Sequence, residues 1–224
     1  PVGVLDAERD FLTRANSAPH RGAHALSEEA TEAYEDARAT VARFIGADEG
    51  EIVFTKNATE ALNLAAYAFS NAEAGSPLRL GEGDEVLITE AEHHANLVPW
   101  QELCRRTGAT LRWIGVTEGG RLDLDQLDEM VTERTKVVAF THASNVLGAI
   151  TDVRRVVAAA RMLAGLDQHQ LAAAAGLSPS TISKIEQGRK NVRADTLRAV
   201  AQALERLRGS QSLVGQPMWM HILG

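Results

Sequence analysis

The strongest constraint on the fold is the alternation, from Gly3 to about Val153, of short apolar runs with longer stretches of helical periodicity. This order is typical of a parallel β-sheet whose strands are joined by crossover helices, so the sequence predicts an α/β fold. Strands are expected at residues 51–55, 85–89, 110–115 and 135–141. Helices are expected at residues 27–44, 59–69, 96–106 and 124–132.

Near Thr151 this pattern ends, and alanine-rich helical stretches joined by short turns replace it. We therefore predict an α/β domain over residues 1–158 and an all-α domain over residues 159–208. The junction falls inside TDVRRVVAAARMLAG, which would serve equally as a crossover helix or as the first helix of the second domain. Residues 209–224 stay unassigned, and a disordered tail, an edge strand and out-of-context sequence are all open for them.

Charge and cysteine content narrow the functional classes. The net charge is −7, yet residues 160–208 hold eight Lys and Arg against four Asp and Glu, so positive charge gathers where a nucleic-acid contact would need it. The single cysteine, Cys104, excludes an internal disulfide framework. No apolar run approaches the roughly 18 residues that span a bilayer, and the expected location is the cytoplasm.

The junction before Thr59 offers a site for an anion. The run EIVFTKNATEALNLAAYAF indicates a strand, a short loop and a helix that opens at Thr59. A helix N-terminus presents unpaired backbone N–H groups and the positive end of the helix dipole, and the Thr59 hydroxyl is a further donor. Threonine is also a common helix N-cap, so a purely structural role for Thr59 remains open.

Polar side chains follow two other expected strands. His93 and His94 come directly after the strand at 85–89, and the strand at 135–141 ends in THASNVLG, which contains Asn145. Ligands of open α/β sheets bind at the carboxyl ends of the strands, so these side chains are expected to converge on one edge of the sheet.

A metal site is not expected. His20 and His24 form one histidine pair, and His93 and His94 form another. Neither pair is accompanied by Cys or carboxylate residues at ligand spacing.

Five strings carry a resemblance to a known family: HRGAH, FTKNATEALN, EAEHHANLVPWQELC, RTGATLRWI and THASNVLGAITDV. Over about the first 158 residues they resemble, in the same order, the Suf-type cysteine desulfurases, which have the class V aminotransferase fold and use pyridoxal phosphate. The resemblance implies that Ala58 and Thr59 receive the cofactor phosphate. It also implies that His93 stacks on the pyridine ring and that Asn145 contacts the cofactor or substrate. The residues that it places near the active site are His20, Arg21 and His24.

The chain also departs from that family, so the domain is expected to be incomplete. The family's first strand would precede Pro1, and the strand with the Asp that pairs with the pyridinium nitrogen would follow residue 155. The Schiff-base lysine has no counterpart in Lys56 or Lys136, and Cys104 is interpreted as core packing, not as the persulfide cysteine. We therefore expect no complete catalytic set and no covalent binding of pyridoxal phosphate.

Residues 168–188, QHQLAAAAGLSPSTISKIEQG, meet the demands of a helix-turn-helix. Ala172 is the small residue where two helices would cross, and Gly176 is the turn glycine. Ser178 is a natural N-cap, and Pro179 suits the first helical turn. The apolar positions are filled by Leu171, Ala175, Leu177, Ile182 and Ile185. An ordinary alanine-rich helical hairpin is the alternative.

This segment resembles the Cro and lambda-repressor-like family through the pattern Q-x-x-L-A-x-x-x-G-x-S-x-x-x-I-S-x-x-E-x-G. The resemblance implies that the second helix enters the major groove of double-stranded DNA and that the protein binds as a homodimer. The residues implied to face base edges are Pro179, Ser180, Thr181 and Lys184. The residues implied to meet phosphates are Gln168, Arg189, Lys190 and Asn191. Glu186 is expected to be structural, because DNA would repel its carboxylate.

Three hypotheses about function remain open. The main prediction is a DNA-binding protein whose enzyme-like part is a sensor or a relic. The alternative is part of a cysteine desulfurase, which transfers sulfur from cysteine for iron–sulfur cluster assembly. The third is a chimera of two genes without a joint function.

Overall fold

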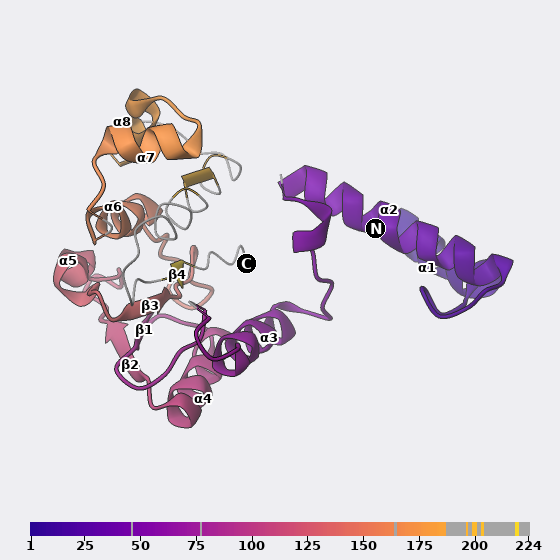
Figure 1. The fold of residues 1–224 in the computed structure, drawn as a ribbon, viewed down its shortest axis with the longest axis horizontal. Coiled ribbons are helices and arrows are strands. Elements are labelled where there is room, and N and C mark those ends of the chain that lie inside the picture. Colours follow the sequence, from indigo (N-terminus) through magenta and orange to yellow (C-terminus); the bar gives the residue numbers. More distant parts are fainter. Residues whose placement is uncertain are drawn as a thin grey trace. The chain divides into compact units, whose positions relative to one another are not determined.

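The computed structural model describes residues 1–45, 47–76, 78–163, 165–186, 196, 199–200, 203 and 218–219. The chain divides into two compact units, Pro1–Phe54 and Thr55–Gly224. We call them unit 1 and unit 2, and both are drawn in Figure 1.

Unit 1 is built from helices. Helix α1 spans Val2–Asp10 and continues as a π-helical turn, η1, over Phe11–Ala15; α2 spans Ala25–Ile45, and the 3-10 turn η2 spans Glu49–Glu51. The buried apolar residues of these helices are all alanines, namely Ala15, Ala30 and Ala42. The predicted helix at 27–44 is confirmed, whereas α1 was not predicted.

The strand predicted at residues 51–55 is wrong. Asp48 and Glu51 close a capping box around η2, in which the Asp48 backbone N–H donates to the Glu51 carboxylate at 2.9 Å. The first residue of the expected strand therefore belongs to a helical turn. The segment after it stays unpaired, and Val53 and Phe54 are exposed. An apolar β-branched run forms a strand only where a neighbouring strand offers hydrogen-bonding groups, and none of the described strands reaches this segment.

Unit 2 contains a parallel sheet in the order β2-β1-β3-β4. Strand β1 spans Glu85–Thr89, β2 Thr110–Ile114, β3 Thr135–Val138 and β4 Met218–Trp219. The first three strands confirm the predictions at 85–89, 110–115 and 135–141, although β3 is shorter than expected. For Met218 and Trp219 the edge-strand interpretation holds, and the rest of residues 209–224 lies outside the described residues.

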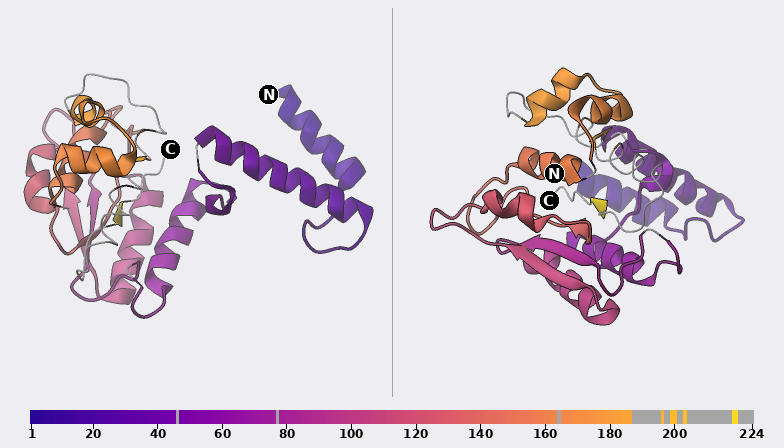
Figure 2. Two further views of the ribbon diagram at one scale, coloured as in Figure 1. Left: turned by 45° about the horizontal axis from the view of Figure 1, so that its top comes forward. Right: turned by 60° about the vertical axis from the view of Figure 1, so that its left-hand side comes forward.

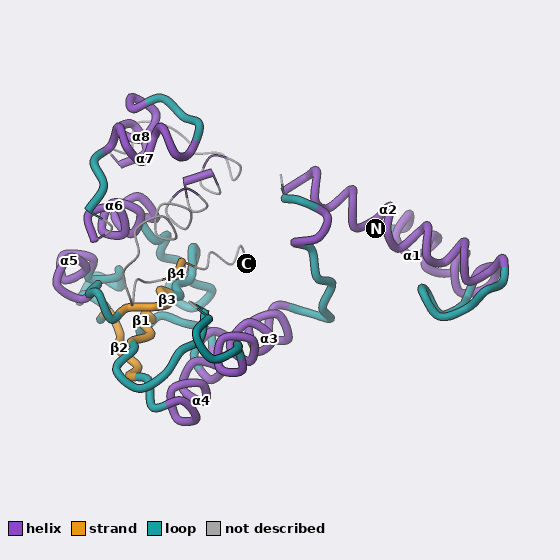
Figure 3. Tube along the Cα trace, in the orientation of Figure 1, coloured by secondary structure: helices purple, strands orange, loops and turns teal. Residues whose placement is uncertain are grey.

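Helices cover both faces of this sheet, as Figures 1 and 2 show. Helices α3 (Ala58–Asn71) and α4 (Val98–Thr107) lie on one face, and α5 (Leu127–Met130) and α6 (Val153–Leu163) lie on the other. Two short 3-10 turns, η3 (His94–Asn96) and η4 (Leu124–Gln126), precede α4 and α5. The predicted helix at 124–132 is therefore shorter and partly 3-10, and Figure 3 distinguishes the helices, strands and loops of both units by colour.

The strand side chains alternate between two apolar cores. Val86 and Ile88 of β1 pack with Leu62, Trp100 and Leu103 beneath α3 and α4. The residue between them belongs to the opposite core, whose members are Leu87, Ile114, Leu127, Val131, Val138, Val156 and Ala159. A strand that is apolar on both faces is what a parallel sheet between two helical layers requires.

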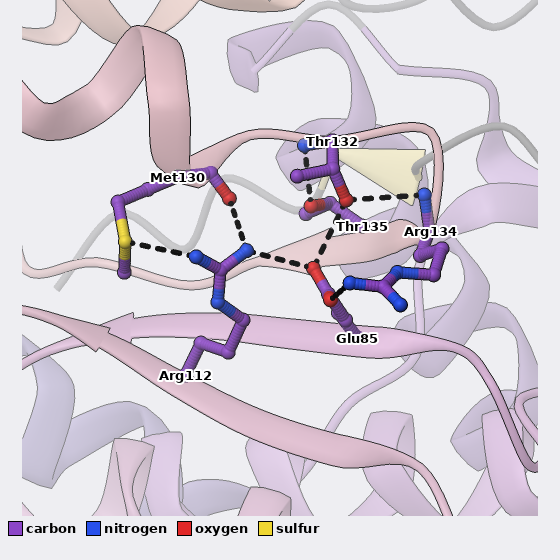
Figure 4. Close-up of polar contacts among 6 residues, drawn as sticks. All are labelled: Glu85, Arg112, Met130, Thr132, Arg134 and Thr135. Carbon is purple, nitrogen blue, oxygen red and sulfur yellow. Dashed lines mark hydrogen bonds and ion pairs between the residues drawn. The ribbon is translucent and has the colours of Figure 1, made fainter.

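A polar cluster closes the amino-terminal end of the sheet, and Figure 4 shows its contacts. Glu85, whose side chain is 5% exposed, accepts from Arg112 Nη1 at 3.0 Å and from the Thr132 hydroxyl at 3.0 Å. Arg134 Nη2 lies 2.7 Å from its other oxygen. Arg112 also donates to the Met130 carbonyl at 3.1 Å. The cluster joins β1, β2 and the loop before β3 at the edge opposite their carboxyl ends.

Two further helices follow α6 in unit 2. Helix α7 spans Gln168–Ala175 and begins with a capping box around Asp167; α8 spans Pro179–Glu186. Gly176 ends α7 with a φ of 64°, a conformation that glycine adopts without strain. The buried residues around this pair are Leu166, Leu171, Ala172, Ile182, Ile185, Val200 and Ala203. The predicted turn and apolar positions are therefore present.

Helix α6 contacts both neighbouring cores. Val156 and Ala159 pack against the sheet, and two residues after Ala159, Arg161 Nε lies 2.6 Å from a Glu186 carboxylate oxygen on α8. Both side chains of this ion pair are largely buried. The helix runs without a break through residue 158, where the sequence predicts the domain junction. Among the described helices, none is both long and apolar enough to cross a membrane.

Candidate cofactor site

The N-terminus of α3 presents two backbone donors. Asn57 caps the helix, and its side-chain oxygen accepts from the Glu60 N–H at 2.9 Å. The Glu60 carboxylate reaches back to the Lys56 N–H at 2.6 Å. The N–H groups of Ala58 and Thr59 have no acceptor among the described residues, and both residues are exposed. These two N–H groups and the Thr59 hydroxyl fit an anionic group.

The loop after β1 carries the two neighbouring histidines. His93 is exposed, and its Nδ1 accepts from the Ala95 N–H at 3.0 Å, which caps η3. The His93 and His94 ring centroids lie 6.3 Å apart. One nitrogen of His93 is therefore engaged with the backbone, while the ring stays accessible for stacking.

Asn145 lies in a compact loop after β3. The Ser144 N–H donates to the Ala149 carbonyl at 2.9 Å, and the Gly148 N–H donates to the Ser144 carbonyl at 2.9 Å. The buried Ser144 hydroxyl accepts from two backbone N–H groups of the same loop. Asn145 is exposed, and its amide has no partner among the described residues. Hydrogen bonds within the loop therefore fix its backbone, and the Asn145 side-chain amide stays available to a ligand.

Contacts within unit 2 bring these three segments to the same edge of the sheet. Helix α3 contacts η3, and Leu62 shares a core with Ala95 and Leu97. The loops after β1 and β3 are joined directly, because the Thr141 N–H donates to the Glu92 carboxylate at 2.7 Å. The predicted convergence at the carboxyl ends of the strands is found for the segments that carry His93 and Asn145, and α3, which carries Thr59 in its first turn, contacts η3 beside them.

A cavity of about 230 Å³ lies beside this junction. It is bordered by the loop after β2 and by the loop after β3, and Ala91 and Thr141 contribute to its wall. The charged residues that line it are Arg121, Asp123, Asp125 and Asp152.

His20, Arg21 and His24 belong to unit 1. His20 Nε2 lies 3.0 Å from a Glu35 carboxylate oxygen, and the His20 ring meets the Tyr34 ring edge-on. His24 Nδ1 accepts from a backbone N–H of α2, and Arg21 is exposed. The residues assigned to the cofactor lie in unit 2, so the proximity of these three to the active site stays a prediction.

Cys104 is a core residue, as predicted. It lies on α4 between the apolar residues of the first core, with an exposure of 8%. Burial raises the pKa of its thiol to about 11. Since the thiolate is the nucleophilic form, Cys104 stays protonated at neutral pH and is unsuited to carry a persulfide.

Four of the residues implied to contact DNA lie on α8. Lys184 is exposed on α8, and Pro179 is the first residue of that helix. The Ser180 and Thr181 hydroxyls lie 2.9 Å and 2.8 Å from the Ser178 hydroxyl.

The residues implied to meet DNA phosphates are one residue of α7, which bonds within the protein, and three residues outside the described part of the chain. Gln168 donates to Glu186 at 2.6 Å, so one of its donors is used within the protein. Arg161 and Gln168 together hold the Glu186 carboxylate, which confirms the structural role predicted for Glu186. Arg189, Lys190 and Asn191 lie outside the described residues. Their role, and that of Lys184, stays a prediction.

Glu92 is a site residue that the sequence analysis missed. Its carboxylate accepts hydrogen bonds from Thr89, Asn96 and the backbone of Thr141. The available signal was a glutamate directly before the two histidines, with hydroxyl and amide side chains three residues earlier and four residues later. Within the described ranges, no three His, Cys, Asp or Glu side chains gather into a group that could hold a metal ion.

Several known proteins are similar to this chain in sequence and in fold. The chain is 58% identical over 168 residues to a probable cysteine desulfurase of Mycobacterium leprae and 50% identical over 167 residues to one of Streptomyces coelicolor. Each alignment covers 74% of this chain, but only 39% and 40% of the relative. The chain thus spans about two fifths of the length of these curated relatives.

Solved structures give the same result. The apo structure of a cysteine desulfurase from Thermococcus onnurineus NA1 is 37% identical and superposes with a TM-score of 0.64, over 74% of this chain and 39% of that one. The Escherichia coli cysteine desulfurase CsdA is 34% identical, with a TM-score of 0.59, over 74% of this chain and 40% of that one. Residues 1–193 match the family described as aminotransferase class-V. The chain therefore belongs to the class-V aminotransferase family.

Proposed function

We propose that unit 2 holds the phosphate and ring of pyridoxal phosphate, as the cofactor-binding part of a cysteine desulfurase. The observation that carries the proposal is the pair of unpartnered N–H groups at Ala58 and Thr59. The phosphate of pyridoxal phosphate is an anion of the size that a helix N-terminus binds. The family uses this cofactor, and the relatives compared above are named cysteine desulfurases.

Each candidate residue has a defined task in this proposal. Ala58 and Thr59 bind the phosphate through two N–H groups and a hydroxyl, and the dipole of α3 favours its negative charge. His93 stacks on the ring, and Asn145 donates or accepts through its amide. When bound, the cofactor supplies the electron sink of the reaction. We assign sulfur transfer from cysteine to an enzyme in which this part is joined to the remainder of the fold.

Replacing Thr59 with Val tests the phosphate site. The change removes one donor to a doubly charged group and keeps the shape of the side chain. We expect the affinity for pyridoxal phosphate, measured by equilibrium dialysis of the full chain, to fall about tenfold, which corresponds to roughly 1.4 kcal/mol. The affinity for pyridoxal, which lacks the phosphate, is expected to stay as in the parent.

A matched control is Thr40→Val, which changes an exposed threonine inside α2 of unit 1. It is expected to leave both affinities unchanged. Equal affinity of the parent for pyridoxal and pyridoxal phosphate would contradict the phosphate site, as would an unchanged affinity of Thr59→Val.

The second candidate function is contact with duplex DNA through α8, the main prediction from the sequence. Gly176 ends α7 in a left-handed conformation, and the two helices share an apolar core, as a helix-turn-helix and an ordinary helical hairpin both require. Ser180 and Lys184 are both exposed and lie four residues apart on α8, so they share one helix face. On that face Lys184 would donate to guanine, and a homodimer would read two half-sites.

Selection of the full chain on random DNA duplexes tests this candidate. If a sequence is enriched, Lys184→Ala should weaken binding to it by about 1–3 kcal/mol, because one base-edge contact is lost. Lys56→Ala, which removes an equal charge from an exposed loop outside α7 and α8, should retain the parent's preference. Failure to enrich any sequence, or equal effects of the two substitutions, would contradict a specific DNA contact.

A further inference from the structure

The Glu92 carboxylate accepts hydrogen bonds from three separate segments. The Thr89 hydroxyl at the end of β1 donates to Oε1 at 2.5 Å, and the Thr141 backbone N–H after β3 donates to the same oxygen at 2.7 Å. Asn96 of η3 donates through Nδ2 to Oε2 at 2.6 Å. A single side chain therefore ties together the ends of two strands and the turn that follows His93.

The hydrogen-bond network continues into the core, and the donor and the acceptor of each bond are determined by the groups involved. The indole N–H of Trp100, a fully buried residue of α4, donates to Asn96 Oδ1 at 2.9 Å. This donation commits the Asn96 oxygen to Trp100 and turns the amide nitrogen toward Glu92. The indole and the backbone N–H of Thr141 can only donate, so the position of Glu92 demands an acceptor on both oxygens.

We propose that Glu92 is the positioning residue of the cofactor-ring site, holding the His93 loop against the end of β3. Its neighbour His93 is exposed, and among the described residues its ring contacts only the Ala95 N–H and the His94 ring, so the ring takes its position from the loop backbone that Glu92 ties to the ends of β1 and β3. The importance for the cofactor rests on the proposed function, whereas the placement of His93 does not. Burial raises the pKa of Glu92, and the three donors oppose this by favouring the carboxylate.

The polarity of the network makes a sharp test possible. In Glu92→Gln, the new NH2 group must face either the Thr141 N–H or the Asn96 NH2, and both are donors. Turning the Asn96 amide over would only move the conflict to the Trp100 indole. Adding Asn96→Asp removes the conflict, because the aspartate accepts from both the new glutamine and Trp100. The double variant also keeps the net charge of the parent.

The experiment compares the parent, Glu92→Gln, Asn96→Asp and the double variant as full chains. One readout is the pair of nuclear magnetic resonance signals from the His93 ring and the Trp100 indole without cofactor. The other is the affinity for pyridoxal phosphate by equilibrium dialysis. Glu90→Gln is the matched control, since Glu90 lies in the same loop and, among the described residues, its carboxylate accepts a hydrogen bond from the Val116 N–H, at 3.1 Å, and none from η3 or β3.

We expect both single variants to shift the His93 and Trp100 signals and to weaken cofactor binding about tenfold, equivalent to the loss of one buried charge-assisted hydrogen bond. The double variant should restore the His93 signals and bring the affinity within about twofold of the parent, whereas the Trp100 indole now donates to a carboxylate and keeps a shifted signal. Glu90→Gln should behave like the parent. Restoration by a second substitution separates this role from a general loss of stability.

Two results would overturn the proposal for Glu92: unchanged His93 signals in Glu92→Gln, or a double variant no closer to the parent than the single variants. A third result bears on the proposed function alone. If the parent does not bind pyridoxal phosphate, while the His93 signals shift in the single variants and return in the double variant, Glu92 positions the loop but the cofactor assignment is wrong.

Discussion

Replacing Trp100 with Ala is expected to lower the free energy of unfolding of unit 2 by about 3–5 kcal/mol, the cost of removing a large buried aromatic side chain. Trp100 is fully buried between α3 and β1, and its ring stacks on Phe69 with centroids 6.2 Å apart. The indole also donates to Asn96, so the substitution leaves a cavity and an unpaired amide oxygen. Urea unfolding followed by far-ultraviolet circular dichroism measures the change.

Trp113 provides the control on the same sheet. It lies on β2 and is 55% exposed, so Trp113→Ala should cost less than about 1 kcal/mol. Equal unfolding midpoints for the two variants would mean that the first core is not packed as described.

The second large effect is expected at Glu85. Glu85→Ala removes the carboxylate that pairs with the partly buried Arg112 and accepts from the Thr132 hydroxyl, and we expect a loss of about 2–3 kcal/mol in the free energy of unfolding. The contribution of Arg134 to this loss is small because its side chain is 68% exposed. The control is Glu102→Ala, which breaks an exposed ion pair with Arg105 and should leave the free energy of unfolding close to that of the parent.

The same cluster predicts a dependence on pH. Burial acts to raise the pKa of Glu85, but the hydrogen bonds from Arg112 and Thr132 and the charges of both arginines outweigh it and hold the pKa below its ordinary value. A carboxylate with a lowered pKa in the folded state stabilises the fold above its unfolded-state pKa, and this contribution is lost as the pH falls through the folded-state pKa. The difference in stability between the parent and Glu85→Gln should therefore shrink in acid. A difference that stays constant or grows would contradict the ion cluster.

The sheet could be predicted because its strands carry their own signal. Val86, Leu87 and Ile88 form an apolar run between polar ends, which is the pattern that a strand covered on both faces requires. The run EIVFT at 51–55 resembles the run EVLIT at 85–89, but no described strand pairs with it. Whether a run finds a partner strand depends on segments elsewhere in the chain, so the run alone does not predict it. The two-residue strand β4 is the converse case, since only its pairing with β3 defines it.

The sequence predicted which chain segments form the candidate site, but not the hydrogen bonds that hold those segments together. The rule that ligands bind at the carboxyl ends of strands brought His93 and Asn145 together, and Thr59 was predicted separately because it lies in the first turn of a helix. The sequence analysis missed Glu92 because its role depends on the Thr141 N–H. That group is far away in the sequence and becomes a neighbour of Glu92 only when β1 and β3 pair. Helices α7 and α8 were predictable because Gly176 and the buried Leu171 and Ile182 occupy positions that a tight helical turn demands.

The most direct test of the cofactor site is a titration of the full chain with pyridoxal phosphate, followed residue by residue through the backbone amide signals. The account predicts that the largest shifts occur at Ala58 and Thr59, with smaller shifts at His93 and Asn145. Shifts confined to the first turn of α8, or an absence of shifts at Ala58 and Thr59 at saturating cofactor, would contradict it.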